Sequence, residues 1–297
     1  MTNYIKINDL ANNETKTSPF AVYPGERISI REVPSPRHMY LTDVDKVILV
    51  FINKYLVLSS KLLLQALRNA KMEIEQKDLQ NRLHMLTDAA YLQSARFTNE
   101  DGTYAAGMVY SVGYRGRGYL KSTMGVQPRL SGYIAQMDSS TVKRYLSVNQ
   151  YLINAGKDYG ATEVGHTLLV PEPKKDRPDK IFRAYGMVQE QSKTVIIDAV
   201  RKDIDKEYLL ERLDRMNDTI SHRNCNTQVQ KTVELVLIAE SCEHLKEVNN
   251  WLKGKHFSKL SICLSTDTLT NNQPECCLVE REKSTGFFRS LFTAACY

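Results

Sequence analysis

The hydrophobic pattern between residues 41 and 112 changes its period partway, and this change constrains the fold more than any other feature of the chain. Apolar residues first recur at helical spacing, and after Thr87 they alternate as in a half-buried strand. The alternation is interrupted from Asn99 to Gly102, where the residues are typical of a turn and the glycine suits a positive φ. We therefore predict helices followed by an antiparallel hairpin.

The helical part divides into three predicted helices. The first covers about residues 43–55, and Thr42 with Asp45 gives it a capping pattern. Ser59 and Ser60 can cap the second, a break follows at 71–76, and the third covers about 77–87. Strands are predicted at 91–97 and 104–112. Three helices followed by a hairpin, within about 75 residues, is the order of a winged helix-turn-helix domain.

In such a domain the third helix enters the major groove of DNA, and the hairpin lies beside the flanking backbone. Gln80 and Asn81 could read base edges, and Arg82 could reach guanine or phosphate. Two arginines on a glycine-rich stretch at 114–118, interpreted as a flexible loop, suit phosphate or minor-groove contact. The predicted DNA-contacting residues are Lys77, Gln80, Asn81, Arg82, His84, Arg96, Asn99, Arg115, Arg117 and Lys121. The alternative is a winged helix that contacts proteins only, with these residues solvated.

The distribution of charge favours the same segment. The whole chain has a net charge of +6, and residues 41–130 contain 12 Lys+Arg against 8 Asp+Glu, a net +4. A local basic excess is a weak sign of a phosphate-binding surface, and a solvated surface with a slight basic bias would look the same.

The rest of the chain predicts a second domain. A helix at 141–155 is interpreted as a connector, and strands and helices then alternate as in an α/β layered domain. The predicted fold class is mixed α/β. We predict an N-terminal arm at 1–40, a winged helix-turn-helix domain at 41–130, a connector at 131–160, an α/β domain at 161–275 and a tail at 276–297.

Membrane, disulfide and metal-site classes are not favoured by the sequence. No stretch approaches the roughly 20 apolar residues of a membrane helix, and the first residues are polar without an apolar signal region, so we expect a cytoplasmic protein. The six cysteines include no CxxC pair, so we expect neither a zinc site nor a disulfide framework. Nucleotide-binding and hydrolase motifs are also missing, and no cofactor is expected.

Several short segments resemble one known family. Residues 83–92 look like the end of a recognition helix leading into a wing, 114–120 read Y-x-G-x-G-x-L, and Pro178-Asp179 precedes a strand ending in Asp198. Across about residues 41–265 this order is similar to the replication-relaxation proteins of plasmids and conjugative elements. The resemblance implies a winged helix joined to a domain like the restriction-endonuclease fold.

That fold raises the alternative of a Mg²⁺-dependent nuclease. Such enzymes hold the metal between two acids on adjacent strands, and a lysine two residues after the second acid orients water. Asp179 and Asp198 could supply the acids, but Val200 stands where the lysine should be, and alternation sends Arg201 to the opposite face. We therefore expect a degenerate nuclease-like domain with a structural or binding role.

The leading expectation is a DNA-binding accessory or regulatory protein of a plasmid or conjugative element, serving replication, conjugative DNA processing or transcription control. Double-stranded DNA would be its partner, together with replication or conjugation proteins, and pairing on two half-sites would make it a homodimer. The alternatives are the nuclease using Asp179 and Asp198, with Mg²⁺ as its only cofactor, and a protein-binding scaffold.

Overall fold

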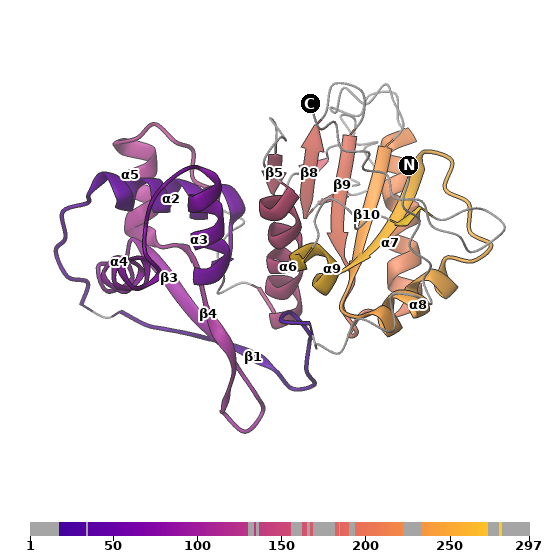
Figure 1. Cartoon of the computed structure of the whole chain (residues 1–297), viewed down its shortest axis with the longest axis horizontal. Helices are drawn as coiled ribbons and strands as arrows, with labels where there is room; N and C mark the ends of the chain where they lie inside the picture. The colour runs from indigo at the N-terminus through magenta and orange to yellow at the C-terminus, as the bar shows by residue number, and fades with distance from the viewer. Residues whose placement is uncertain are drawn as a thin grey trace, which may run out of the picture. The chain divides into compact units, whose positions relative to one another are not determined.

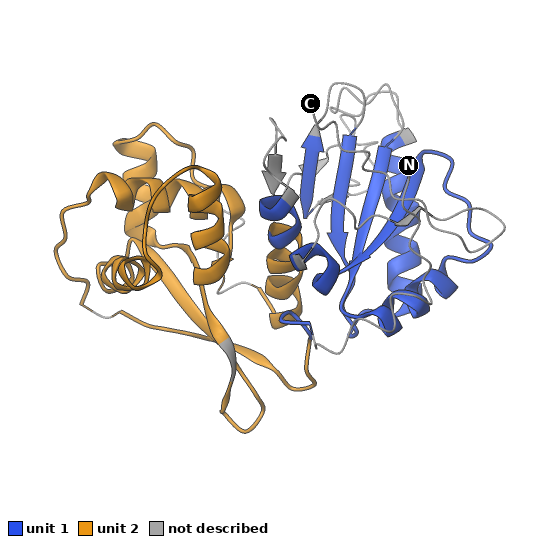
Figure 2. Cartoon of the chain, in the orientation of Figure 1, with its two compact units in different colours: residues 1–21, 150–297 blue, residues 22–149 orange. Residues whose placement is uncertain are grey.

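The chain folds into a mixed α/β structure, as predicted. The computed structural model describes residues 18–33, 35–129, 134, 137–155, 162–164, 167–168, 182–183, 185–189, 194–221, 233–272 and 279–280. It contains two compact units (Figure 2): residues 22–149, here called the helix–hairpin unit, and residues 1–21 with 150–297, here called the sheet unit. The boundary at 149/150 falls inside the helix α6 (Ser139–Ala155), which was predicted as a connector.

The helix–hairpin unit follows the predicted order closely (Figure 1). Strands β3 and β4 form the predicted hairpin, and the short β2 pairs with β4. The elements in chain order are β1 (Arg27–Ile30), α2 (Asp43–Tyr55), β2 (Leu58–Ser59), α3 (Ser60–Asn69), α4 (Gln76–Asp88), β3 (Leu92–Thr98), β4 (Tyr104–Val112), α5 (Tyr114–Ser122) and the first part of α6. The sheet order is β1-β3-β4-β2, with antiparallel neighbours throughout.

Capping fixes where these helices begin. Thr42 and Asp45 form the predicted capping box: the Asp45 N–H donates to the Thr42 hydroxyl, and the Thr42 N–H donates to the Asp45 carboxylate. Ser59 caps α3 by accepting from the Leu62 N–H. A side-chain cap of this kind contributes about 1 kcal/mol. The helices then bury leucine and isoleucine faces, including Ile48 and Leu83, which are fully enclosed.

The predicted N-terminal arm at 1–40 is not one irregular segment in its described part. Strand β1 adds to the hairpin by pairing antiparallel with β3, and Arg27 lies opposite Thr98. Residues 18–21 belong to the sheet unit, where Ser18 and Phe20 are buried. Residues 27–31 alternate between polar and apolar, which is the pattern of a half-buried strand.

The glycine-rich segment at 114–118 was predicted as a flexible loop, and this prediction was wrong, because it lies in the helix α5. Its glycines permit close packing. A Cβ atom on Gly116 would lie 2.2 Å from the Tyr91 carbonyl oxygen, and one on Gly113 would lie 2.6 Å from the Ala90 carbonyl oxygen. Only glycine lets the start of α5 approach the backbone at the start of β3 this closely.

The sheet unit contains a six-stranded mixed sheet of order β12-β11-β10-β9-β8-β5 (Figure 1). Strands β9, β10 and β11 are parallel to one another, and β5, β8 and β12 pair antiparallel with their neighbours. The elements are β5 (Thr162–Val164), β6 (Thr167–Leu168), β7 (Phe182–Arg183), β8 (Gly186–Gln189), β9 (Thr194–Ala199), α7 (Lys206–Ser221), β10 (Val233–Ala239), α8 (Cys242–Trp251), β11 (Leu260–Thr266), α9 (Asp267–Asn272) and β12 (Val279–Glu280).

Helices α7 and α8 follow β9 and β10 and cover one face of this sheet. Leu209 and Leu213 of α7 and Leu245 of α8 join Leu235 and Leu237 of β10 in one buried core. This is the α/β layering predicted for 161–275. In the part of the chain described, none of the helices has the length and apolar character needed to cross a membrane.

Candidate nucleic-acid interface

The outer face of α4 presents polar side chains to solvent. Leu79, Leu83 and Leu86 point into the core. Lys77, Gln80 and Asn81 are exposed on the other side, as predicted for base-reading positions. The helix itself is electrically balanced, with two basic and two acidic residues, so attraction to phosphate must come from its surroundings.

Arg82 of α4 pairs with a buried acid of α2. Its guanidinium lies 3.5 Å from the carboxylate of Asp45, whose side chain is fully buried at the start of α2. A buried carboxylate is costly without a compensating charge. Arg82 therefore contributes to the fold of the helix–hairpin unit, and its contact with guanine or phosphate stays a prediction.

A groove of about 490 Å³ lies between α4 and the sheet. Small residues form part of its lining, and two arginines face it. We call it the α4–sheet groove, and its lining residues are Ser29, Ile30, Arg31, His84, Ser94, Ala95, Arg96, Tyr104 and Met108. None of these lining residues is acidic, and in the described part of the chain the one carboxylate bound to them is that of Asp88, which pairs with Arg31.

Arg31 forms the wall of the groove next to α4. Its guanidinium donates to the Asp88 carboxylate at 2.6 Å and lies 3.1 Å from Nδ1 of His84. Since arginine only donates, His84 Nδ1 must accept in this contact. Arg31 is thereby held in place from α4, which positions one positive charge at the groove.

Arg96 and Tyr104 form the opposite wall, on the hairpin. The guanidinium carbon of Arg96 lies 4.7 Å from the centre of the Tyr104 ring, and Tyr104 is 65% exposed. The two arginines of the groove also act on Tyr110 of the same hairpin. Burial raises the pKa of Tyr110, and the charges of Arg96 and Arg31 oppose this rise.

The hairpin turn takes its shape from Asn99 and Gly102. The Asn99 N–H donates to the Thr103 carbonyl at 2.8 Å, and its side-chain amide donates to the Thr103 hydroxyl. Gly102 has a φ of +81°, as its place in the turn predicted. Asn99, predicted as a backbone contact for DNA, is thus a turn-forming residue.

The basic residues of α5 divide between packing and surface. Arg115 is half-buried and donates to the carbonyl oxygens of Arg37 and Ala89 at 3.1 and 3.5 Å, which ties α5 to the segments beside it. Arg117 is also half-buried, and Lys121 is exposed in the last turn. Of these predicted DNA contacts, Lys121 is the one fully at the surface.

The net charge differs between the two units. Residues 22–149 contain 17 Lys+Arg against 11 Asp+Glu, a net charge of +6 that equals the net charge of the whole chain. The sheet unit contains 23 of each and is neutral. The net positive charge of the chain is thus carried by the helix–hairpin unit.

Sequence reasoning missed Arg31 and Tyr104 as site residues. Arg31 follows a strand that was read as part of an irregular arm, and Tyr104 was read only as the start of a strand. The one available signal was the alternation at 27–31. It would have predicted a strand, but not that the strand pairs with β3.

The nuclease alternative finds no support in the described residues. Asp198 faces α7, where its carboxylate accepts from Arg212 Nε at 2.8 Å, and Val200 is buried. Arg201 follows the end of β9 and donates to the Asp267 carboxylate at 2.6 Å. Within the described ranges, no group of three or more His, Cys, Asp or Glu side chains could hold a metal ion. Asp179 lies outside these ranges.

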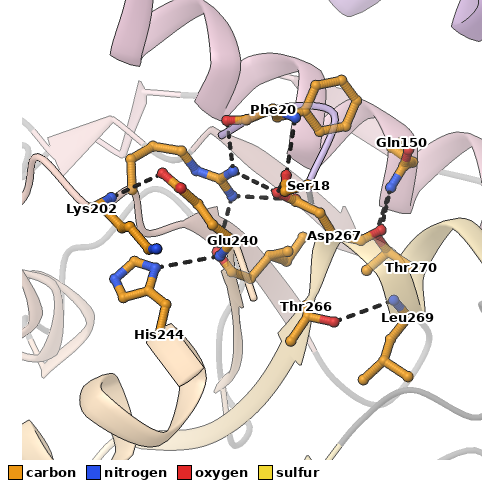
Figure 3. Close-up of polar contacts among 12 residues, drawn as sticks. Ser18, Phe20, Gln150, Lys202, Glu240, His244, Thr266, Asp267, Leu269 and Thr270 are labelled. Carbon is orange, nitrogen blue, oxygen red and sulfur yellow. Dashed lines mark hydrogen bonds and ion pairs between the residues drawn. The ribbon is translucent and has the colours of Figure 1, made fainter. Parts of the chain in front are cut away.

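A buried polar cluster occupies the carboxyl ends of β9, β10 and β11 in the sheet unit (Figure 3). Arg201 and Asp267 form a fully buried ion pair, with 2.6 Å between Nη1 and Oδ2. Ser18 donates to the same carboxylate, and Arg201 donates to the Phe20 carbonyl. Gln150 donates to the Asp267 carbonyl at 2.7 Å. Ligands often bind at this edge of an open α/β sheet, but here these groups bind one another.

His244 at the edge of this cluster predicts a pH dependence. Burial lowers the pKa of His244 to about 4, with Arg201 and Lys202 acting in the same direction. The folded protein keeps this ring neutral, and the unfolded chain binds a proton near pH 6.5. Stability conferred by the neutral ring is therefore fully present above pH 6.5 and is lost as the pH falls towards 4, by up to about 3 kcal/mol.

Thermal unfolding between pH 7 and 4 would measure this loss. We expect His244→Asn to flatten the pH dependence, since asparagine does not titrate. His256→Asn is the matched control, because His256 is exposed in the same unit, and it should follow the parent protein. Equal slopes for the parent and His244→Asn would contradict the assignment.

Comparisons with known proteins add no family to this geometry: no family model, curated protein or solved structure matches the chain.

Proposed function

We propose that the helix–hairpin unit binds double-stranded DNA as a winged helix, with α4 in the major groove and the β3–β4 hairpin beside the backbone. The observation that supports this most is the placement of Lys77, Gln80 and Asn81 on the solvent side of a helix that leads directly into an antiparallel hairpin. Amide side chains can make paired hydrogen bonds to adenine, and lysine can reach guanine or phosphate.

Two further features support the same surface. All of the net positive charge lies in this unit. The hairpin and the strand beside it add Arg96 and Arg31, so the sheet supplies the charge that α4 lacks. Phosphate contacts would set the register of the protein on DNA, and α4 would supply sequence discrimination.

The biological role that we propose rests on the family resemblance. A role as an accessory or regulatory protein in plasmid replication, conjugative DNA processing or transcription control is part of this proposal, and so is a homodimer on two half-sites. These parts rest on residues 83–92 and 114–120 and on the winged-helix order.

A mobility-shift or anisotropy titration with duplex DNA at several salt concentrations tests the proposal. We expect binding that weakens with salt, with a slope of about −0.9 per phosphate contacted. The triple variant Lys77→Ala, Gln80→Ala, Asn81→Ala should bind at least tenfold more weakly, because each paired base contact is worth about 1–3 kcal/mol.

The control is Lys61→Ala with Gln65→Ala, which removes exposed polar side chains from α3 in the same unit and should leave binding unchanged. If the parent protein fails to bind duplex DNA even at low salt, the proposal is wrong and the protein-binding scaffold becomes the better hypothesis.

A further inference from the structure

We propose that the α4–sheet groove receives an unpaired nucleotide, so that the protein prefers duplex DNA bordered by a single-stranded segment. This inference rests on the proposed DNA binding by the helix–hairpin unit and names the class of DNA bound. The base would stack on the Arg96–Tyr104 pair, and a phosphate of the same strand would face the groove arginines.

The register of the sheet makes one wall of the groove continuous. Ser29 of β1 lies opposite Arg96 of β3, and Arg96 lies opposite Met108 of β4, so the three side chains form one row across three strands. Arg96 also contacts the Met108 sulfur at 3.7 Å. Tyr104 adds an exposed aromatic ring beside the guanidinium of this row.

Such a surface fits a nucleobase better than a phosphate alone. Phosphate recognition needs only a cation, whereas Tyr104 adds a large exposed ring, with the guanidinium carbon of Arg96 4.7 Å from its centre. Bases stack on aromatic rings and on arginine planes without regard to sequence, and each such contact is worth roughly a 5- to 150-fold change in affinity. In an intact duplex the flat faces of the bases are covered by their neighbours, so only an unpaired base can use this site.

The groove also has the size and charge that a nucleotide requires. Its volume of about 490 Å³ lies within the roughly 300–1,000 Å³ of small-ligand sites. Ser94 and Ala95 are small residues of its lining, and Arg31, which pairs with Asp88, adds a second guanidinium group to the lining besides Arg96. A base can thus stack on one wall while the backbone stays between two guanidinium groups.

Fluorescence anisotropy with the full chain would test this, using a blunt duplex and the same duplex with a short single-stranded overhang. We expect the overhang to raise affinity roughly 5- to 150-fold for the parent protein. Tyr104→Ala should lose this preference, so that its affinities for the two DNAs become equal, and Tyr104→Phe should keep the preference. An overhang of abasic sugars should behave like the blunt duplex, and 2-aminopurine in the overhang should be quenched on binding.

Tyr114→Ala is the matched control, because Tyr114 is a similarly exposed tyrosine on α5 of the same unit, outside the groove. It should preserve the preference. Equal binding of both DNAs by the parent, or a preference that survives Tyr104→Ala, overturns this inference while leaving duplex binding intact. Absence of binding to either DNA overturns the proposed function itself, so the two failures are distinguishable.

Discussion

Replacing Asp267 with asparagine is expected to lower the free energy of unfolding of the sheet unit by about 3–5 kcal/mol. Both Arg201 and Asp267 have fully buried side chains, so the variant leaves a guanidinium in the interior without its counter-charge. The same carboxylate also accepts from Ser18. Trp251 is the only tryptophan in the chain and packs against the core of the sheet unit, so its fluorescence during urea unfolding reports on this unit.

Two controls define the cause of this loss. Glu211→Gln removes the carboxylate from an exposed ion pair with Arg215 on α7, and exposed pairs contribute little, so we expect almost no change. The double variant Arg201→Met with Asp267→Leu removes both charges and should be more stable than Asp267→Asn, because no unpaired charge remains. An Asp267→Asn protein that unfolds at the parental urea concentration would show that the pair contributes nothing.

Changing Gly116 to alanine is expected to destabilise the helix–hairpin unit by at least about 2–3 kcal/mol. The new Cβ would lie 2.2 Å from the carbonyl oxygen of Tyr91. This oxygen belongs to the backbone, so it cannot move aside as the end of a flexible side chain could. The start of α5 would have to leave its place beside β3, where the Gly113 N–H donates to Tyr91 at 2.8 Å and the Arg115 N–H donates to Ala90 at 3.2 Å.

Gly118→Ala in the same helix should have the opposite effect. A Cβ at Gly118 meets nothing within 4 Å, and alanine is favoured over glycine within a helix by roughly 0.5–1 kcal/mol. Far-UV circular dichroism during urea unfolding would compare the two variants, and Trp251 fluorescence should report an unchanged sheet unit in both. The same shift in both variants would contradict the close-packing explanation.

The helices and the hairpin of the helix–hairpin unit were predictable because local signals agree there. Helix α2 covers the predicted residues 43–55, and strand β4 covers the predicted residues 104–112. A cap, an amphipathic period and a turn glycine all indicate the same structure in this part of the chain. α5 was missed because glycine was read for its flexibility, whereas the fold uses its small size. That distinction depends on Tyr91, which is distant in sequence and close in space.

The candidate site was only partly predictable for a related reason. Lys77, Gln80 and Asn81 follow from helical periodicity alone. Whether an arginine is available to a ligand depends on tertiary partners: Arg82 compensates Asp45 and Arg115 binds backbone carbonyls, whereas Arg96 lines a groove. Arg31 joins that groove only because β1 pairs with β3, and no local pattern specifies such a pairing.

The hydrogen bond between Ser18 and Asp267 spans 249 residues, and this separation has a consequence for biosynthesis. At roughly 5–20 residues per second, a ribosome needs on the order of 10–50 s to make the intervening chain. The whole helix–hairpin unit is translated within that interval, so its own contacts can form before Asp267, the partner of Ser18, is made. The protein is therefore expected to mature in two stages, and the buried pair of Ser18 with Asp267 can form only in the second.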